Sequence, residues 1–201
     1  MSALRRTDTE GYRMRKLIVS TYATLDGRVD DLQDWTVPYN TEESAQYHGK
    51  LLENSDGLVL GRRTYEAFAH LWPARAGELP YIDKINAMAK HVASTTLTDF
   101  AWENSHPIAG DAAEGVAALK RAGGQDLVVY GGRDLIATLA GQGLVDEWRV
   151  LVHPVLFGRG RALLPDGGAR TDVELTGCEP MASGVVVLTY RAAPTRTGRI
   201  S

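Results

Sequence analysis

The order of apolar runs and helical segments predicts an α/β fold with a mostly parallel central sheet. Short apolar runs alternate with segments of helical spacing up to about residue 152. Strands joined through helices run parallel, and helices then cover both faces of the sheet. The last two apolar runs, 171–178 and 184–191, are separated only by residues 179–183. They predict an antiparallel hairpin at the C-terminal end.

Length and composition predict one globular domain. The chain has 201 residues, of which 44% are hydrophobic and 23% charged, and these values are ordinary for a single soluble domain. We expect the domain to span 15–192, between a flexible leader at 1–14 and a flexible tail at 193–201. The leader lacks the apolar core of a signal peptide, and no apolar run reaches the length of a membrane span.

Charge and cysteine content argue against several classes of function. The net charge of −3, from 22 Lys and Arg against 25 Asp and Glu, offers no basic field for nucleic acid. The single cysteine, Cys178, leaves no intrachain disulfide or thiolate zinc cluster and fits a reducing, cytoplasmic compartment. We expect its side chain to be buried and inert in its strand. The acidic loop at 26–35 lacks the ligand register of a calcium loop, so no metal is expected.

Local signals place the individual elements. A β-branched strand at 16–23 opens the domain and runs into a turn at 26–27. Thr41 or Asn40 caps the first helix, whose opening turn is acidic. The expected helices are 41–54, 64–70, 82–88, 111–120 and 133–140. The expected strands are 16–23, 57–60, 91–94, 100–104, 127–130, 147–152, 171–178 and 184–191.

Two glycine turns, each between an apolar run and a helix start, indicate the function best. They are Gly-Arg-Arg-Thr at 61–64 and Tyr-Gly-Gly at 130–132. Such turns expose backbone N–H groups at the positive end of a helix dipole, which binds phosphate. The paired arginines suit an additional phosphate ester. Each turn alone is compatible with an ordinary strand-to-helix connection, but two in one small domain can hold the phosphates of one dinucleotide, and we expect NADPH.

Other polar residues carry weaker signals. Hydroxyl side chains at 94–96 follow a predicted strand, and ligands of open α/β sheets bind at the carboxyl ends of strands. Taken alone, they are better explained by a plain polar loop. A lone His153 before a proline is more often a packed side chain than a catalytic base. The chain has no Walker motif, Gly-x-Ser-x-Gly elbow or His-Glu-x-x-His pair, which argues against common kinase and hydrolase functions.

Five motifs in order resemble one known superfamily. They are Thr-Leu-Asp-Gly at 24–27, Leu-Gly-Arg-Arg-Thr-Tyr-Glu at 60–66, Val-Ala-Ser-Thr-Thr-Leu at 92–97, Tyr-Gly-Gly at 130–132, and His-Pro-Val-Leu-Phe-Gly-Arg-Gly at 153–160. Together they resemble the dihydrofolate-reductase-like superfamily over roughly residues 15–191. Within it, the chain is most similar to the family of the C-terminal reductase domain of the bifunctional riboflavin-biosynthesis deaminase-reductase.

The resemblance implies a dihydrofolate-reductase-like three-layer fold of eight strands with NADPH across the strand ends. The arginine turn would hold the 2′-phosphate and pyrophosphate, and the glycine pair would meet the pyrophosphate. The first strand would border the nicotinamide. The loop at 26–35 would resemble a mobile lid, with Trp35 at its far end. The implied cofactor-binding residues are Thr21, Ala23, Gly61, Arg62, Arg63, Thr64, Ser94, Thr95, Tyr130, Gly131 and Gly132.

The expected function is therefore an NADPH-dependent reductase. It would transfer a hydride to a C=N or C=O bond of a small heterocycle, either a pyrimidine like 5-amino-6-(5-phosphoribosylamino)uracil or a pterin- or folate-like compound. Glu42, Glu43 or ordered water would supply the proton, since the superfamily places a carboxylate near this helix start. The alternative is a nucleotide-binding module without turnover. The terminal hairpin suggests a homodimer, and we expect no nucleic-acid or membrane partner.

Overall fold

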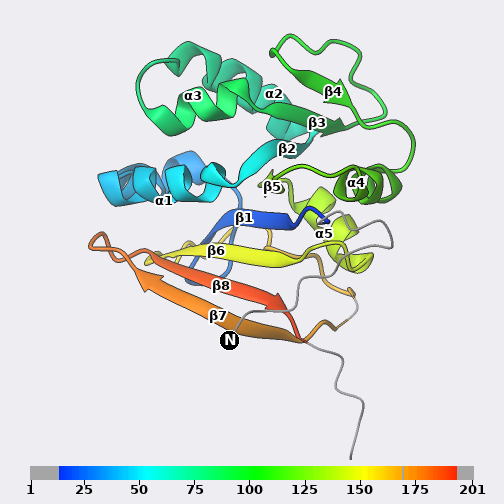
Figure 1. Cartoon of the computed structure of the whole chain (residues 1–201). Coiled ribbons are helices and arrows are strands. Elements are labelled where there is room, and N and C mark those ends of the chain that lie inside the picture. Colours follow the sequence, from blue (N-terminus) through cyan, green and yellow to red (C-terminus); the bar gives the residue numbers. More distant parts are fainter. Residues whose placement is uncertain (1–13, 169, 194–201) are drawn as a thin grey trace, which may run out of the picture.

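The computed structural model describes residues 14–168 and 170–193. Apart from one residue each, the expected leader at 1–14 and tail at 193–201 lie outside the described residues. The domain is built on one eight-stranded sheet with the order β4-β3-β2-β5-β1-β6-β8-β7 (Figure 1). Its strands are β1 (Leu17–Thr24), β2 (Ser55–Gly61), β3 (Ala89–Ala93), β4 (Ser105–Pro107), β5 (Asp126–Tyr130), β6 (Glu147–His153), β7 (Val173–Pro180) and β8 (Val186–Ala192).

Strand direction follows the connections. The six strands from β4 to β6 pair in parallel, and β8 and β7 then pair antiparallel to their neighbours. The five α-helices of the described chain are α1 (Glu42–Glu53), α2 (Arg62–Leu71), α3 (Pro80–Ala87), α4 (Ala112–Arg121) and α5 (Arg133–Gly141). The mostly parallel sheet, the helices and the terminal hairpin confirm the predicted fold class. None of the helices in the described ranges is long and apolar enough to cross a membrane.

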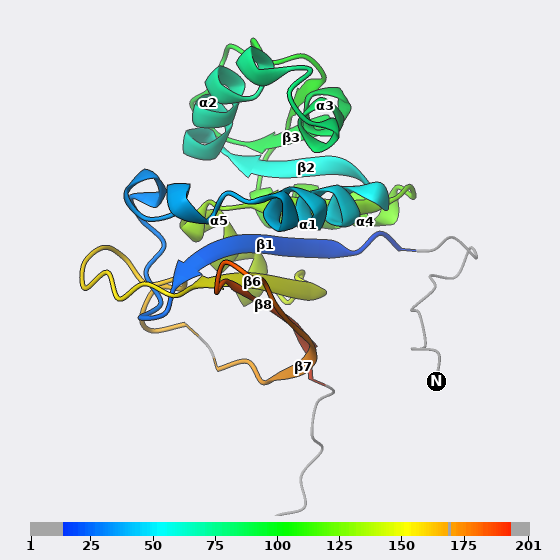
Figure 2. The same ribbon diagram turned by 90° about the vertical axis from the view of Figure 1, so that its left-hand side faces the viewer.

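Helices cover both faces of the sheet. In Figure 2, which looks from the α1 side, α1 crosses in front of the sheet, and α4 and α5 lie behind it. Strand β5 shows how the sequence divides between the two layers. Its Leu127 and Val129 pack with α4 and α5, whereas Val128 and Tyr130 pack with α1, α2 and α3. This period of two is the expected alternation of a buried strand.

One predicted strand, 100–104, is wrong. The strand in this region is β4, and 100–104 lie outside it. Trp102 explains the apolar pattern, because its ring is buried and bonded to helices rather than to a neighbouring strand. Its backbone N–H donates to the Tyr65 hydroxyl at 3.1 Å, and its Nε1 donates to Asn86 Oδ1 at 3.0 Å. The segment is a packed loop that anchors a large ring.

The expected burial of Cys178 is also wrong, because its side chain is exposed. It lies on β7, which pairs only with β8 and forms one edge of the sheet. Nearly all residues of β7 are exposed. An apolar sequence run identified the strand correctly, but it could not show that this strand ends the sheet.

Candidate cofactor site

A cavity of about 740 Å³ opens where β2, β3 and β5 end. Its volume is in the range of small-molecule and cofactor sites. The position also agrees with the general rule that α/β sheets bind ligands outside the carboxyl ends of their strands. Eight of the residues expected to bind cofactor are among those that line it, namely Thr21, Gly61, Arg62, Arg63, Ser94, Thr95, Gly131 and Gly132.

The N-termini of three helices meet at this cavity, and they are not equivalent. Helix α4 begins after Asp111, whose carboxylate accepts hydrogen bonds from the N–H groups of Ala113 and Glu114. Helices α2 and α5 begin after Gly61 and Gly132, and neither has a side-chain cap. The first N–H groups of α2 and α5 therefore remain available to an external acceptor, and the helix dipole favours an anion there.

The two glycine turns lie next to each other. Gly131 and Gly132 have φ angles of +61° and +79°, which residues with a side chain rarely adopt. A Cβ on Gly132 would lie 3.4 Å from the Thr64 hydroxyl oxygen, so the α5 turn touches the first turn of α2. A Cβ on Gly131 would meet no atom within 4 Å. Bare backbone thus borders open space, as close approach of a phosphate requires.

Four arginines line the cavity, and three are already paired. Arg62 lies 3.6 Å from Glu66, while Arg133 pairs with Asp134. Arg161 forms a bidentate pair with Asp30, with contacts of 2.8 and 3.0 Å. Within the described residues, the Arg63 side chain has no hydrogen bond or ion pair. It is therefore the cavity arginine most available to an anionic ligand.

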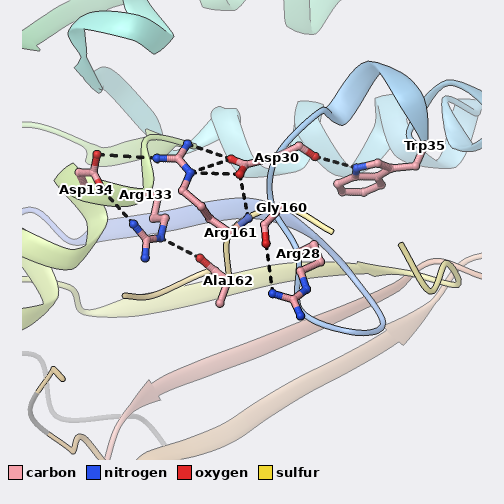
Figure 3. Close-up of polar contacts among 8 residues, drawn as sticks. All are labelled: Arg28, Asp30, Trp35, Arg133, Asp134, Gly160, Arg161 and Ala162. Atoms are coloured by element: carbon pink, nitrogen blue, oxygen red, sulfur yellow. Dashed lines mark hydrogen bonds and ion pairs between the residues drawn. The ribbon is translucent and has the colours of Figure 1, made fainter. Parts of the chain in front are cut away.

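The acidic loop at 26–35 is bonded to the loop at 157–162 (Figure 3). Hydrogen bonds from Arg161 hold the pKa of Asp30 below its usual value. Arg28 donates to the Gly160 carbonyl at 3.1 Å, and Trp35 Nε1 donates to the Asp30 carbonyl at 2.9 Å. Trp35 is buried with its ring edge against His153. Loop closure on a ligand stays a prediction.

The remaining expected residues lie outside the cavity lining. Ala23 is buried and lies two residues after Thr21, on the same face of β1. Thr64 lies next to Gly132. Glu42 accepts a hydrogen bond from Gln46, and Glu43 accepts one from the Ala182 N–H. Glu43 instead borders a second cavity of about 450 Å³ between α1 and the strands β6, β7 and β8. The structure thus does not bring the two carboxylates to the residues that line the larger cavity.

The last expected residue, Tyr130, belongs to a polar group under α1. Its hydroxyl lies 3.1 Å from Nδ1 of His48, and Nε2 of the same ring lies 2.7 Å from the Tyr22 hydroxyl. Burial lowers the pKa of His48 to about 4 and raises the pKa values of both tyrosines. His153 is packed nearby against Tyr22, as its sequence context predicted.

Sequence analysis missed Asp30, Arg133 and Arg161 in the cavity lining and the buried His48 on α1. The glycines of the Gly-Arg-Gly loop before Arg161 were a usable signal that the backbone there comes close to another part of the chain or to a ligand. However, Asp30, the partner of Arg161, is 131 positions away in the sequence. His48 has no distinctive local pattern, and its partners are 26 and 82 positions away.

Solved structures share this fold at low identity. A candidate riboflavin biosynthesis protein from Shewanella sp. PV-4 is 22% identical with a TM-score of 0.70, over 89% of this chain and 99% of that one. The Thermotoga maritima deaminase and 5-amino-6-(5-phosphoribosylamino)uracil reductase is 13% identical with a TM-score of 0.65, over 90% of this chain and 57% of that one. Dihydrofolate reductase from Enterococcus faecalis, in a complex with NADP(H), is 16% identical with a TM-score of 0.63, over 91% and 99%.

Sequence comparison agrees with the structural one. The uncharacterized Bacillus subtilis protein YyaP is 28% identical over 191 residues, which is 90% of this chain and 97% of that protein. The family model described as the RibD C-terminal domain matches residues 15–187. This match spans most of the chain and almost all of its described domain, and the chain therefore belongs to the RibD C-terminal domain family.

Proposed function

We propose that this protein is an NADPH-dependent reductase of a small heterocyclic compound. The observation that carries the proposal is the pair of uncapped helix N-termini, on α2 and α5, that face one cavity beside the unpaired Arg63. Two anion sites and a free arginine fit the two phosphate positions of NADPH. Family membership supports a reductase, and the Enterococcus enzyme shows that this fold accommodates NADP(H).

Each part of the cavity would hold one part of the cofactor. Arg62 and Arg63, with Ser94 and Thr95 nearby, would bind the 2′-phosphate. The turns ending in Thr64 and Gly132 would bind the pyrophosphate through backbone N–H groups. Thr21 and the buried Ala23 would border the nicotinamide. When bound, the cofactor supplies the hydride, and the protein orients the reactants and excludes water.

The substrate proposed is a planar compound with a reducible C=N or C=O bond. The first candidates are 5-amino-6-(5-phosphoribosylamino)uracil, which the name of the Thermotoga enzyme contains, and dihydrofolate. We further propose a cytoplasmic homodimer. Its contact would be the hairpin, because the edge strand β7 exposes Val173 and Leu175, which are 45% and 51% accessible.

The experiment is a titration of NADPH and NADH, followed by an assay of NADPH oxidation with each candidate substrate. The proposal predicts tighter binding of NADPH and oxidation that depends on one substrate. Binding without oxidation by either substrate would favour the alternative, a nucleotide-binding module. Absence of NADPH binding would contradict both functions.

A further inference from the structure

The side chains of Tyr22, His48 and Tyr130 form a polar group in which the number of hydrogens available for hydrogen bonding can be counted. The imidazole of His48 is neutral at neutral pH because burial lowers its pKa to about 4. A neutral imidazole has one N–H donor and one bare nitrogen acceptor. The two tyrosine hydroxyls and the imidazole therefore hold three donor hydrogens, but only two hydrogen bonds join them. One hydrogen must point outside the group.

Burial decides which hydrogen that is. Tyr130 is 8% exposed, and His48 is the only hydrogen-bond partner of its hydroxyl within the described chain. A buried O–H donor left unpaired is unfavourable, so Tyr130 donates to His48 Nδ1. The imidazole hydrogen must then be on Nε2, where it donates to the Tyr22 oxygen. The Tyr22 O–H is left over, and because the Tyr22 side chain is only partly buried, its hydrogen is the one of the three that can point toward a ligand.

Sheet register places Tyr22 next to the expected cofactor position. Pairing between β1 and β5 ends at Ser20 and Tyr130, but β1 continues to Thr24. Thr21, just past the last pair, lines the cavity together with the glycine turn that follows β5. Tyr22 is the next residue, and its ring packs on the α1 face with His48 and His153. A substrate that meets the cofactor from the α1 side would therefore approach this hydroxyl.

We propose that Tyr22 donates the proton in the reduction, and that His48 and Tyr130 are positioning residues that keep its O–H available. This inference rests on the proposed function. The substrate carbon gains a hydride from NADPH while its C=N or C=O π bond breaks. The substrate nitrogen or oxygen gains the Tyr22 proton. His48 Nε2–H donates to the phenolate that forms, and water then returns a proton to Tyr22.

The same region indicates the substrate class. The rings of Phe68 and Tyr81 are only partly buried, Phe68 beside Tyr130 and Tyr81 beside His48. They offer stacking surfaces, and the hydrogen-bonding groups of Tyr22, His48 and Tyr130 beside them are hydroxyls and an uncharged imidazole. A substrate that stacks a flat, uncharged heterocyclic ring here, with a reducible bond that ends in a nitrogen or oxygen acceptor, fits this chemistry.

The test that does not depend on turnover is nitrogen NMR of protein labelled with ¹⁵N-histidine. We expect His48, assigned with a His48→Phe variant, to carry its hydrogen on Nε2 at neutral pH. In Tyr130→Phe the constraint on Nδ1 is lost, and the Nδ1–H form should become populated. Tyr39→Phe is the matched control, because it removes a hydroxyl from the same aromatic group without touching the chain of hydrogen bonds. An Nδ1–H form in the wild-type protein would overturn the inference.

The kinetic test uses Tyr22→Phe with the substrate that the wild-type protein reduces. We expect kcat to fall by about 100-fold or more, the typical contribution of a general acid, with NADPH affinity unchanged. Tyr39→Phe should stay close to wild type. An undiminished kcat in Tyr22→Phe would overturn the role of Tyr22. If the wild-type protein reduces neither substrate, the proposed function fails, and the NMR result alone decides the hydrogen-bond chain.

Discussion

Four of the five α-helices of the described chain, all but α3, begin in one of two ways. Thr41 and Asp111 cap α1 and α4 with side-chain oxygens, which accept from Ser44 N in α1 and from two N–H groups in α4. Helices α2 and α5 begin at glycines without a side-chain cap. All four helices pack on the same sheet, so the difference does not reflect their place in the fold.

The capped helix starts contribute to the stability of the fold, whereas the uncapped helix starts leave N–H groups for ligand binding. A side-chain cap contributes typically about 1 kcal/mol to folding, and a glycine in its place loses only a few tenths. Helices α2 and α5 therefore leave their N–H groups free at little cost to folding. At α4, the Asp111 carboxylate occupies the same groups and adds a negative charge, so a phosphate is disfavoured there although α4 also reaches the cavity. Three experiments test this comparison.

The largest effect is expected from adding a side chain at the glycine turn that precedes α5. Gly132→Val would place a branched side chain against Thr64, at the position proposed for the pyrophosphate. Loss of charge-assisted hydrogen bonds worth about 1.5–3 kcal/mol each predicts at least roughly 100-fold weaker NADPH binding. Thermal melting should show no stabilisation by NADPH in this variant.

Backbone strain in that variant requires its own control. A side chain at a φ of +79° costs on the order of 1–3 kcal/mol of stability by itself. Gly143→Val imposes the same cost at a φ of +64°, at the far end of α5 and in open space. This control should melt earlier but keep its response to NADPH. Equal responses in the two variants would exclude the α5 turn as the binding site.

A smaller and more selective effect is expected from the arginines beside α2. Arg62→Ala and Arg63→Ala should each weaken NADPH by roughly 10- to 100-fold and NADH much less, because a charge-assisted contact to phosphate is worth about 1.5–3 kcal/mol. Titration of both cofactors measures the selectivity. Arg170→Ala, on an exposed arginine paired with Asp172, serves as the control. Equal weakening of both cofactors would contradict the 2′-phosphate assignment.

The smallest effect is expected at a capped helix. Thr41→Ala removes the α1 cap and should lower stability by about 1 kcal/mol, which corresponds to a melting temperature lower by about 2–4 °C. Affinity for NADPH should not change. A loss of NADPH affinity comparable to that of the arginine variants would show that capped and uncapped ends do not have separate roles.

Sequence reasoning succeeded where the signal was local. The Thr41 cap, the two glycine turns and the terminal hairpin all depend on residues close together in the chain, and the structure contains them. It failed where position in the sheet mattered. The apolar start of 100–104 reflects Trp102, which packs on helices, and Cys178 is exposed because β7 is an edge strand.

The candidate site shows the same division. Eight of the eleven expected cofactor-binding residues line the cavity, and most of these eight belong to turns at strand ends. The pairing of Asp30 with Arg161 and the hydrogen bonds of His48 join residues far apart in the sequence, and no local pattern indicates them. Glu42 and Glu43 were candidates from their place at a helix start, yet their carboxylates bond to Gln46 and Ala182 instead of lining the larger cavity.

The most direct test of the account is a crystal structure of the protein with NADPH. We expect electron density for the pyrophosphate at the N-termini of α2 and α5, with the 2′-phosphate at Arg63 and no phosphate at the capped start of α4. Density for the phosphates elsewhere, or an empty cavity at saturating NADPH, would contradict the claim that the uncapped helices form the cofactor site.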